Sequence, residues 1–197
     1  GGTTRRFRIL DPRLRLYANS AFPAGQNDGA VWQGRGFTAA LDGGVFVRAG
    51  PLSGTLRPEL IYTQNRAFPL ASVQEPGRTI YANPYHPLNN KGSIDLPQRF
   101  GPDPFWKLDP GQSSVRLDYG GAALGVATEN LWWGPGIRNA IIMSDNAPGF
   151  PHVFLGTGRP VSVGIGRLEA LWTWGWLERP TSYSDSLRSN RHRFLTG

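Results

Sequence analysis

Several segments of this 197-residue chain alternate apolar and polar side chains at every second position. Over 36–49 the odd positions are mostly apolar, while the even positions include Thr38, Asp42 and Arg48. A period of two is typical of β-strands whose two faces meet different surroundings. The sequence therefore predicts an all-β fold of seven strands, with 191–197 opening another. The other predicted strands are 13–20, 56–63, 114–119, 124–129, 161–165 and 167–176.

The expected connections between these strands differ greatly in length. Those at Gly50–Gly54, at Gly120-Gly121 and at Gly166 are short, whereas those over 66–112 and 131–152 are long. Outer-membrane barrels alternate short periplasmic turns with long external loops, while a β-sandwich of this size has turn signals about every 8–12 residues. The aromatic residues of 66–112 suggest the hypothesis that this loop folds into a barrel or over its mouth.

Three tryptophans, Trp172, Trp174 and Trp176, share one face of a predicted strand. Tryptophan is enriched at membrane interfaces, where one end of the ring meets water. Strand pattern, loop lengths and tryptophans together predict an antiparallel transmembrane β-barrel with long external loops. The bulky polar side chains on the inner faces favour a large barrel of roughly 16–18 strands, of which this chain is a part. Residues 1–197 would then be one incomplete barrel domain. Alternation alone leaves open a soluble β-sandwich with a tryptophan-rich core.

Composition narrows the range of partners and cofactors. The chain has no cysteine, which excludes disulfides, thiol nucleophiles and cysteine-based zinc sites. Its net charge of +7 is scattered and forms no nucleic-acid-binding motif, so we expect no nucleic-acid partner. Three histidines, His86, His152 and His192, lack the spacing of metal ligands. We expect no metal and no other cofactor.

Segment 129–152 holds the densest group of residues suited to a ligand. Two adjacent tryptophans precede a Gly-Pro-Gly turn. Indole rings can stack on sugar rings while polar side chains bind the hydroxyl groups. In an alternative interpretation the tryptophans belong to a membrane-interface girdle and the turns simply cap the barrel. The residues that we expect to contact a polysaccharide are Trp132, Trp133, Arg138, Asn139, Asn146 and His152.

Catalysis is the less favoured interpretation of the acidic residues. A glycosidase needs two carboxyl groups roughly 5–9.5 Å apart, and Asp118 with Glu129 is one candidate pair. Nothing in the sequence sets the distance between them. Acidic residues that alternate with basic residues along strands are more typical of a solvated, ion-paired face. We therefore expect that the protein is not an enzyme.

The run ENLWWGPGIRNAIIMSDNAPGFPH, residues 129–152, resembles the central signature of the capsule-assembly Wzi family of bacterial outer-membrane proteins. Further likenesses are NSAFPAGQNDGAVWQGRGF, DLPQRFG, LDPGQSSVRLDYGGAALGVATEN and GRLEALWTWGWLE. Together they extend over about 19–178. The resemblance implies structural roles for the motif residues Glu129, Gly134, Pro135, Gly136, Ala147, Pro148 and Pro151.

That resemblance implies a large monomeric β-barrel of the bacterial outer membrane that acts as a lectin, of which this chain is about the N-terminal half. It also implies surface or capsular polysaccharide and outer-membrane lipid as partners, and capsule assembly as the role. Two other functions stay open. One is a porin-like outer-membrane channel, and the other is a soluble carbohydrate-binding β-sandwich.

Overall fold

The computed structural model describes residues 5–70, 98–178 and 192–197, and in these residues the all-β prediction is confirmed. Ten of the strands form one antiparallel sheet, while β9 and β10 pair separately as a small hairpin. The strands are β1 (Arg5–Asn19), β2 (Gly36–Ala49), β3 (Leu52–Leu56), β4 (Glu59–Thr63), β5 (Phe105–Asp109), β6 (Ser114–Tyr119), β7 (Ala122–Ala127), β8 (His152–Thr157), β9 (Val161–Ser162), β10 (Arg167–Leu168), β11 (Leu171–Glu178) and β12 (His192–Thr196).

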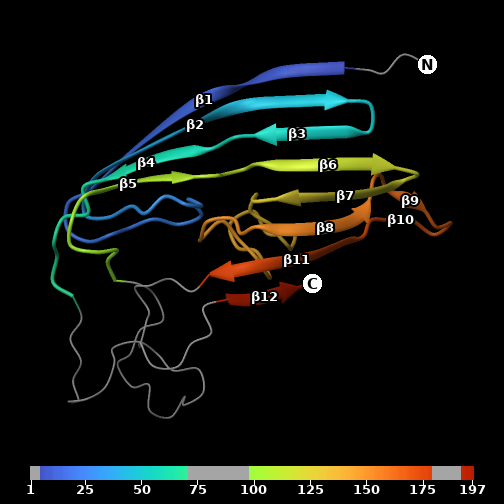
Figure 1. Cartoon of the computed structure of the whole chain (residues 1–197). Helices are drawn as coiled ribbons and strands as arrows, with labels where there is room; N and C mark the ends of the chain where they lie inside the picture. The colour runs from blue at the N-terminus through green and yellow to red at the C-terminus, as the bar shows by residue number, and fades with distance from the viewer. Residues whose placement is uncertain (1–4, 71–97, 179–191) are drawn as a thin grey trace, which may run out of the picture.

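Sheet order follows chain order, as Figure 1 shows. β3 and β4 pair with successive stretches of β2, and β6 and β5 pair in turn with β3 and β4. Each of these pairs is therefore one long strand with an interruption, so the sheet is an up-and-down meander from β1 to β12. No helix in the described ranges is long and apolar enough to cross a membrane.

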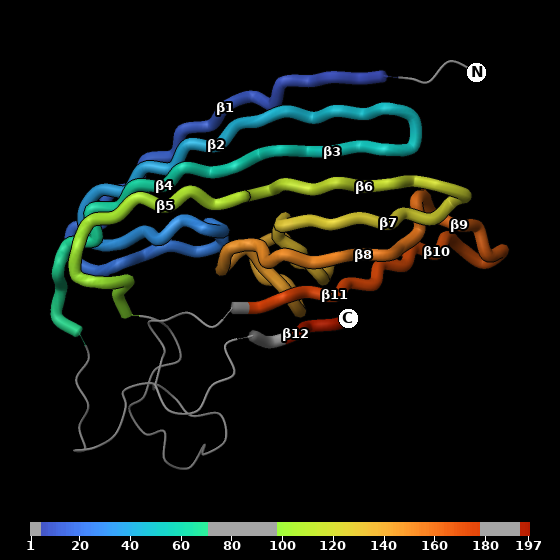
Figure 2. Tube along the Cα trace, viewed as in Figure 1, coloured from blue at the N-terminus to red at the C-terminus, as the bar shows by residue number. Residues whose placement is uncertain are grey.

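The two ends of the strands carry very different connections (Figure 2). At one end, which we call the short-turn end, lie the turn at Gly50-Pro51, the turn at Gly120-Gly121 and the small β9–β10 hairpin. Both glycines of the second turn have positive φ, 59° and 87°, as tight hairpins require. At the other end, the long-loop end, lie 20–35, 128–151 and the described residues 64–70 and 98–104.

One face of the main sheet is apolar and exposed. Register places apolar side chains opposite one another on successive strands, for example Leu52, Leu117 and Leu124. This surface, the apolar face, runs from β1 to β12 and includes Leu108, which is 72% exposed. Its large exposed members are Phe7, Ile9, Leu14, Leu16, Phe37, Leu41, Val47, Leu52, Leu56, Leu60, Trp106, Leu108, Val115, Leu117, Tyr119, Leu124, Val126, Leu155, Trp172, Trp174, Trp176 and Phe194.

Burial is concentrated on the opposite, polar face. Val31 from the loop 20–35 packs there against Ala40 and Ile61, and these three form the small hydrophobic core. Around it lie buried polar residues, such as Thr38 and Thr63, whose hydroxyl groups are hydrogen-bonded at 3.0 Å. The loop 20–35 therefore covers part of the polar face, whereas no described segment covers the apolar face.

The buried acidic residues on the polar face are ion-paired. Asp42, which is only 5% exposed, accepts from Arg57 Nε at 2.7 Å and from Arg13 Nε at 3.4 Å. Such pairing is required because an unpaired buried carboxylate is costly. The other pairs on this face are Arg15 with Glu59, Lys107 with Asp109, and Arg116 with Asp118.

The prediction of a strand over 161–165 in the main sheet is wrong. β8 takes that place, between β7 and β11, and Val161–Ser162 belongs to the separate hairpin. β8 breaks the alternation because Phe154 lies on the polar face. Room for its ring comes from Gly125, where a Cβ atom would lie 2.5 Å from Phe154 Cζ.

Two further boundaries differ from the sequence predictions. β5 lies inside 66–112, which was predicted to be loop throughout, and its backbone pairs with β4. Residues 71–97 lie outside the described residues, so the hypothesis of a loop that plugs the barrel stays a prediction. β1 begins at Arg5, well before the predicted start at Arg13, because an irregularity between Leu10 and Arg13 accommodates Pro12 without ending the pairing with β2.

Candidate functional site

Two of the long loops, 20–35 and 128–151, are joined at the long-loop end. The backbone N–H of Asn27 donates to Asn146 Oδ1 at 2.9 Å, and Asn27 Nδ2 donates to the carbonyl of Arg138 at 2.8 Å. Gly29 N–H donates to the carbonyl of Asp145 at 2.6 Å. Asn27 has a φ of 57°, a left-handed conformation that Asn tolerates better than most residues. We call these joined loops the loop cluster.

A pair of amide side chains fixes the base of the loop cluster to the sheet. Gln112 Nε2 donates to Asn130 Oδ1 at 2.8 Å, while the backbone N–H of Asn130 donates to Gln112 Oε1 at 3.0 Å. Asn130 Nδ2 then crosses the loop to the carbonyl of Ala147, at 2.7 Å. The two ends of 128–151 are therefore held together directly above β7 and β8.

The two adjacent tryptophans are held by the turn that follows them. Trp132 Nε1 donates to the carbonyl of Gly136 at 2.7 Å. Trp133 forms a short antiparallel bridge with Ile142. Gly134 has a φ of 131°, and a Cβ on Gly136 would lie 2.3 Å from the carbonyl oxygen of Asn139. The Gly-Pro-Gly sequence is therefore required by the geometry of this turn, and both indole rings are half-buried.

Three predicted site residues lie on the surface of the loop cluster. Arg138, Asn139 and Asn146 are exposed, and among the described residues no side chain pairs with the guanidinium group of Arg138. Ile137 beside them is 96% exposed. This surface therefore offers a cation, two amides and an apolar side chain, with half-buried indole rings in the adjoining turn.

His152 does not join that surface. It is 2% exposed, its Nδ1 lies 2.8 Å from the carbonyl oxygen of Phe150, and its ring lies between those of Phe150 and Phe154. The side chain projects from β8 onto the polar face, where the ring is needed to fill space. This position favours a packing role for His152 over contact with a ligand.

Other motif residues shape the return of the loop to the sheet. The carbonyl of Pro151 accepts the N–H of Trp176 at 2.9 Å, and the carbonyl of Ala147 accepts from Asn130. Position 149 requires glycine because the backbone of Thr128 passes close to it. A Cβ atom there would lie 1.9 Å from the carbonyl oxygen of Thr128. Pro135 and Pro148 are exposed and Glu129 is half-buried.

Asp118 and Glu129, the candidate glycosidase pair, lie far apart. Asp118 is opposite Ala123 at the short-turn end of β7, and Glu129 follows six residues later, beyond the other end. At about 3.3 Å per residue their separation is about 20 Å, more than twice the largest useful spacing. Asp118 is instead paired with Arg116, at 2.8 Å. The described residues also contain no group of three or more histidines or acids that could hold a metal.

Asn65 is an organising residue that the sequence did not reveal. It is fully buried, and its Nδ2 lies within 2.8–3.1 Å of the carbonyl oxygens of Phe100, Gly101 and Asp103. Its Oδ1 accepts from Trp32 Nε1 at 3.3 Å. A single asparagine thus ties 98–104 to the loop 20–35. The only local signal is its position at the end of β4, since its partners lie more than thirty residues away.

No family model, no curated protein and no solved structure matches this chain. The resemblance to the Wzi family stays a prediction.

Proposed function

We propose that this chain is part of an outer-membrane β-barrel that retains a surface polysaccharide at its long-loop end, as its resemblance to the Wzi family implies. The observation that carries the proposal is the apolar face of the main sheet, which no described segment of the chain covers. Exposed apolar patches larger than a few hundred Å² mark interaction surfaces in soluble monomers. A face that is apolar on every strand matches the lipid-facing surface of a transmembrane barrel.

Strand length and aromatic placement support the same proposal. β2 has 14 residues, more than the 9–11 or so that a tilted strand needs to cross a bilayer. Near the long-loop end the apolar face carries Tyr62 and Trp106, whose rings lie 4.9 Å apart, and Trp176. This placement fits the aromatic girdle of a barrel at one membrane interface.

Trp172, the second residue of β11, lies on the apolar face near the short-turn end, in the row of Leu155 and Leu124. Its Nε1 donates to Thr196 Oγ1 at 2.8 Å, so the polar group is satisfied within the face. Its ring also stacks on Trp174, at 5.0 Å between centroids. In lipid a polar group must find its hydrogen-bond partner within the protein, whereas in water the solvent can supply one. Closure of the barrel would place further strands beside β1 and β12, which each pair on one side only among the described residues.

The loop cluster is the part of the chain best suited to hold a polymer. Its hydrogen bonds between 20–35 and 128–151 fix the backbone, while Arg138 and Asn139 remain free to bind. Each contact to a sugar hydroxyl contributes about 1 kcal/mol. Repeating units of a polymer multiply weak contacts through avidity. We infer that retention depends on the exposed side chains and that the bonds between the loops hold them in place.

The test is retention of polysaccharide by cells that carry the double variant Arg138→Ala/Asn139→Ala. We expect retention to fall several-fold while heat-modifiable gel mobility stays normal, because neither side chain supports the loop. Arg159→Ala, an exposed arginine after β8 at the short-turn end, is the matched control and should leave retention unchanged.

Unchanged retention by the folded double variant would contradict the proposed binding surface. Ion conductance through the purified protein in a planar bilayer, together with unchanged retention, would favour the channel. Partition of the protein into water without detergent would contradict the membrane location itself.

A further inference from the structure

The polar face is unevenly charged along the strands. In its middle each buried acid is paired with a base, as Asp42 is with Arg57. Nearer the short-turn end the bases outnumber the acids. Arg6, Arg8, Arg48 and Arg116 lie there against Asp118 alone among the described residues, and that acid is bound by Arg116.

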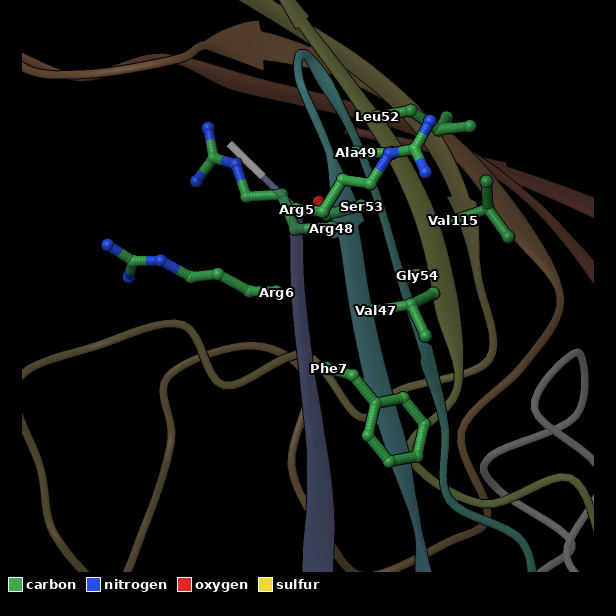
Figure 3. A pocket seen from close by; sticks show the side chains of 10 residues that line it. All are labelled: Arg5, Arg6, Phe7, Val47, Arg48, Ala49, Leu52, Ser53, Gly54 and Val115. Atoms are coloured by element: carbon green, nitrogen blue, oxygen red, sulfur yellow. The ribbon is translucent and has the colours of Figure 1, made fainter. Parts of the chain in front are cut away.

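Arg6 and Arg48 are directly opposite each other in the register of β1 and β2. Side chains in such positions share a face, with Cβ atoms about 5 Å apart, and like charges there are destabilising. Figure 3 shows Arg6 on the other side of the strands from Phe7, Val47 and Val115. Neither arginine has an acidic partner among the described residues. Within the described ranges, the side chain of Arg48 makes one hydrogen bond, from Nε to the carbonyl of Gly50 at 3.2 Å.

Hydroxyl groups continue both rows of arginines across the sheet. Arg48 is opposite Ser53, which is opposite Arg116. In the next row on the same face Arg8 is opposite Phe46, and then come Thr55 and Ser114. The hydroxyl groups of Ser53, Thr55 and Ser114 have no hydrogen-bond partner within the described part of the chain. Neighbouring strands lie about 4.8 Å apart, so the hydroxyl groups of Ser53 and Thr55 on β3 and of Ser114 on β6 are close enough for one ligand to contact them together.

One of these arginines is already partly oriented. The guanidinium carbon of Arg8 lies 5.8 Å from the centroid of the Phe46 ring, over its face. Such a contact leaves the edge of the guanidinium group, with its N–H donors, free to bind an anion. The surface thus combines uncompensated guanidinium groups, unpaired hydroxyl donors and one arginine held against a ring.

We propose that this Arg-Ser-Thr surface binds a soluble phosphate-bearing ligand, at the short-turn end of the polar face and away from the loop cluster. Phosphate carries up to two charges on oxygens that accept from several donors at once, and arginine binds it in a bidentate manner. A carboxylate offers two oxygens and one charge, which would leave part of this donor set unused. The proposal is independent of the polysaccharide site, since no residue is shared.

The experiment titrates inorganic tripolyphosphate into the purified protein in uncharged detergent and follows the heat of binding. We expect binding that weakens as salt rises. The double variant Arg6→Gln/Arg48→Gln should lose affinity at least about tenfold, since it removes two charge-assisted contacts. Arg5→Gln is the matched control. It neighbours Arg6 in sequence but lies opposite Ala49 in the register, hence on the apolar face, and should change affinity less than about twofold.

A second pair of variants keeps the test decisive if the double variant does not fold. Arg8→Gln and Ser53→Ala each remove one donor and should each weaken binding about two- to tenfold. Three results would overturn the proposal: no binding by the unaltered protein, equal losses in Arg5→Gln and Arg6→Gln/Arg48→Gln, or variants that alter binding of detergent-dispersed phosphatidylglycerol but not of tripolyphosphate. The last result would identify a lipid headgroup as the ligand.

Discussion

Asn65 shows how much of this architecture depends on one side chain. Its amide bridges 98–104 and the loop that contains Trp32, and it does so from a left-handed backbone conformation with a φ of 45°. Alanine would remove the donor to the carbonyls of residues 100, 101 and 103 and the acceptor of Trp32 Nε1, and each such bond contributes about 0.5–1.5 kcal/mol. No comparable role belongs to Asn139, which is exposed.

We therefore predict that Asn65→Ala lowers the free energy of unfolding by about 2–3 kcal/mol, while Asn139→Ala changes it by less than about 0.5 kcal/mol. Urea unfolding followed by tryptophan fluorescence, with the protein in lipid vesicles, measures both. Equal stability of the two variants would show that the bonds of Asn65 are not needed for the fold.

The site residues could be predicted from the sequence only where their role is local. The Gly-Pro-Gly turn after Trp133 was recognisable because φ and close approach demand glycine. The burial of His152 could not be predicted, since it depends on Phe154 and on Phe150, which packs over Gly175. These contacts arise only when β8 lies between β7 and β11. No sequence pattern predicts the contacts of Asn65 either, because its partners are distant in the sequence.

At the scale of elements, alternation predicts a strand only when its two faces differ. β2 and β6 were recognised because apolar and polar side chains alternate in them. β8 was hidden by the run Val153, Phe154, Leu155, which is apolar at three successive positions. The middle residue is accommodated on the polar face by a glycine on β7. Whether this segment can form a strand therefore depends on a residue of the neighbouring strand β7, which the sequence of β8 alone does not reveal.

Pairing of large rings with glycines gives a prediction for β11. Phe150 packs over Gly175, and a Cβ atom there would lie 2.2 Å from Phe150 Cε2. Gly175→Ala should therefore destabilise the protein by about 1–3 kcal/mol through overpacking. In a Phe150→Ala background the same change should cost less than about 0.5 kcal/mol, because the clash is with that ring alone.

Thermal unfolding of the four proteins in this cycle, in one detergent, measures the coupling. A coupling energy near zero would mean that the ring does not rest on Gly175 and that the return of 128–151 to the sheet is held by other contacts, such as the bond from Trp176 N–H to the carbonyl of Pro151.

In the molecule as a whole, the exposure of the two sheet faces is the reverse of that in a soluble sheet protein. Its acids Asp42, Glu59 and Asp109 are buried and ion-paired on the polar face, while aliphatic and aromatic side chains cover the exposed face. In water the hydrophobic effect would oppose this arrangement. In a bilayer, as we propose, the apolar face would meet acyl chains instead of water.

The central claim is that the apolar face contacts lipid, and the natural absence of cysteine makes it directly measurable. Single cysteines at each position of Ser114–Tyr119, spin-labelled in reconstituted vesicles, report collisions with oxygen dissolved in lipid and with a nickel chelate in water. We predict high oxygen and low nickel accessibility at Val115, Leu117 and Tyr119, and a lower ratio of oxygen to nickel accessibility at Ser114, Arg116 and Asp118. If the first three positions were accessible to the nickel chelate, or accessible to neither reagent as in a packed sandwich core, the claim would be contradicted.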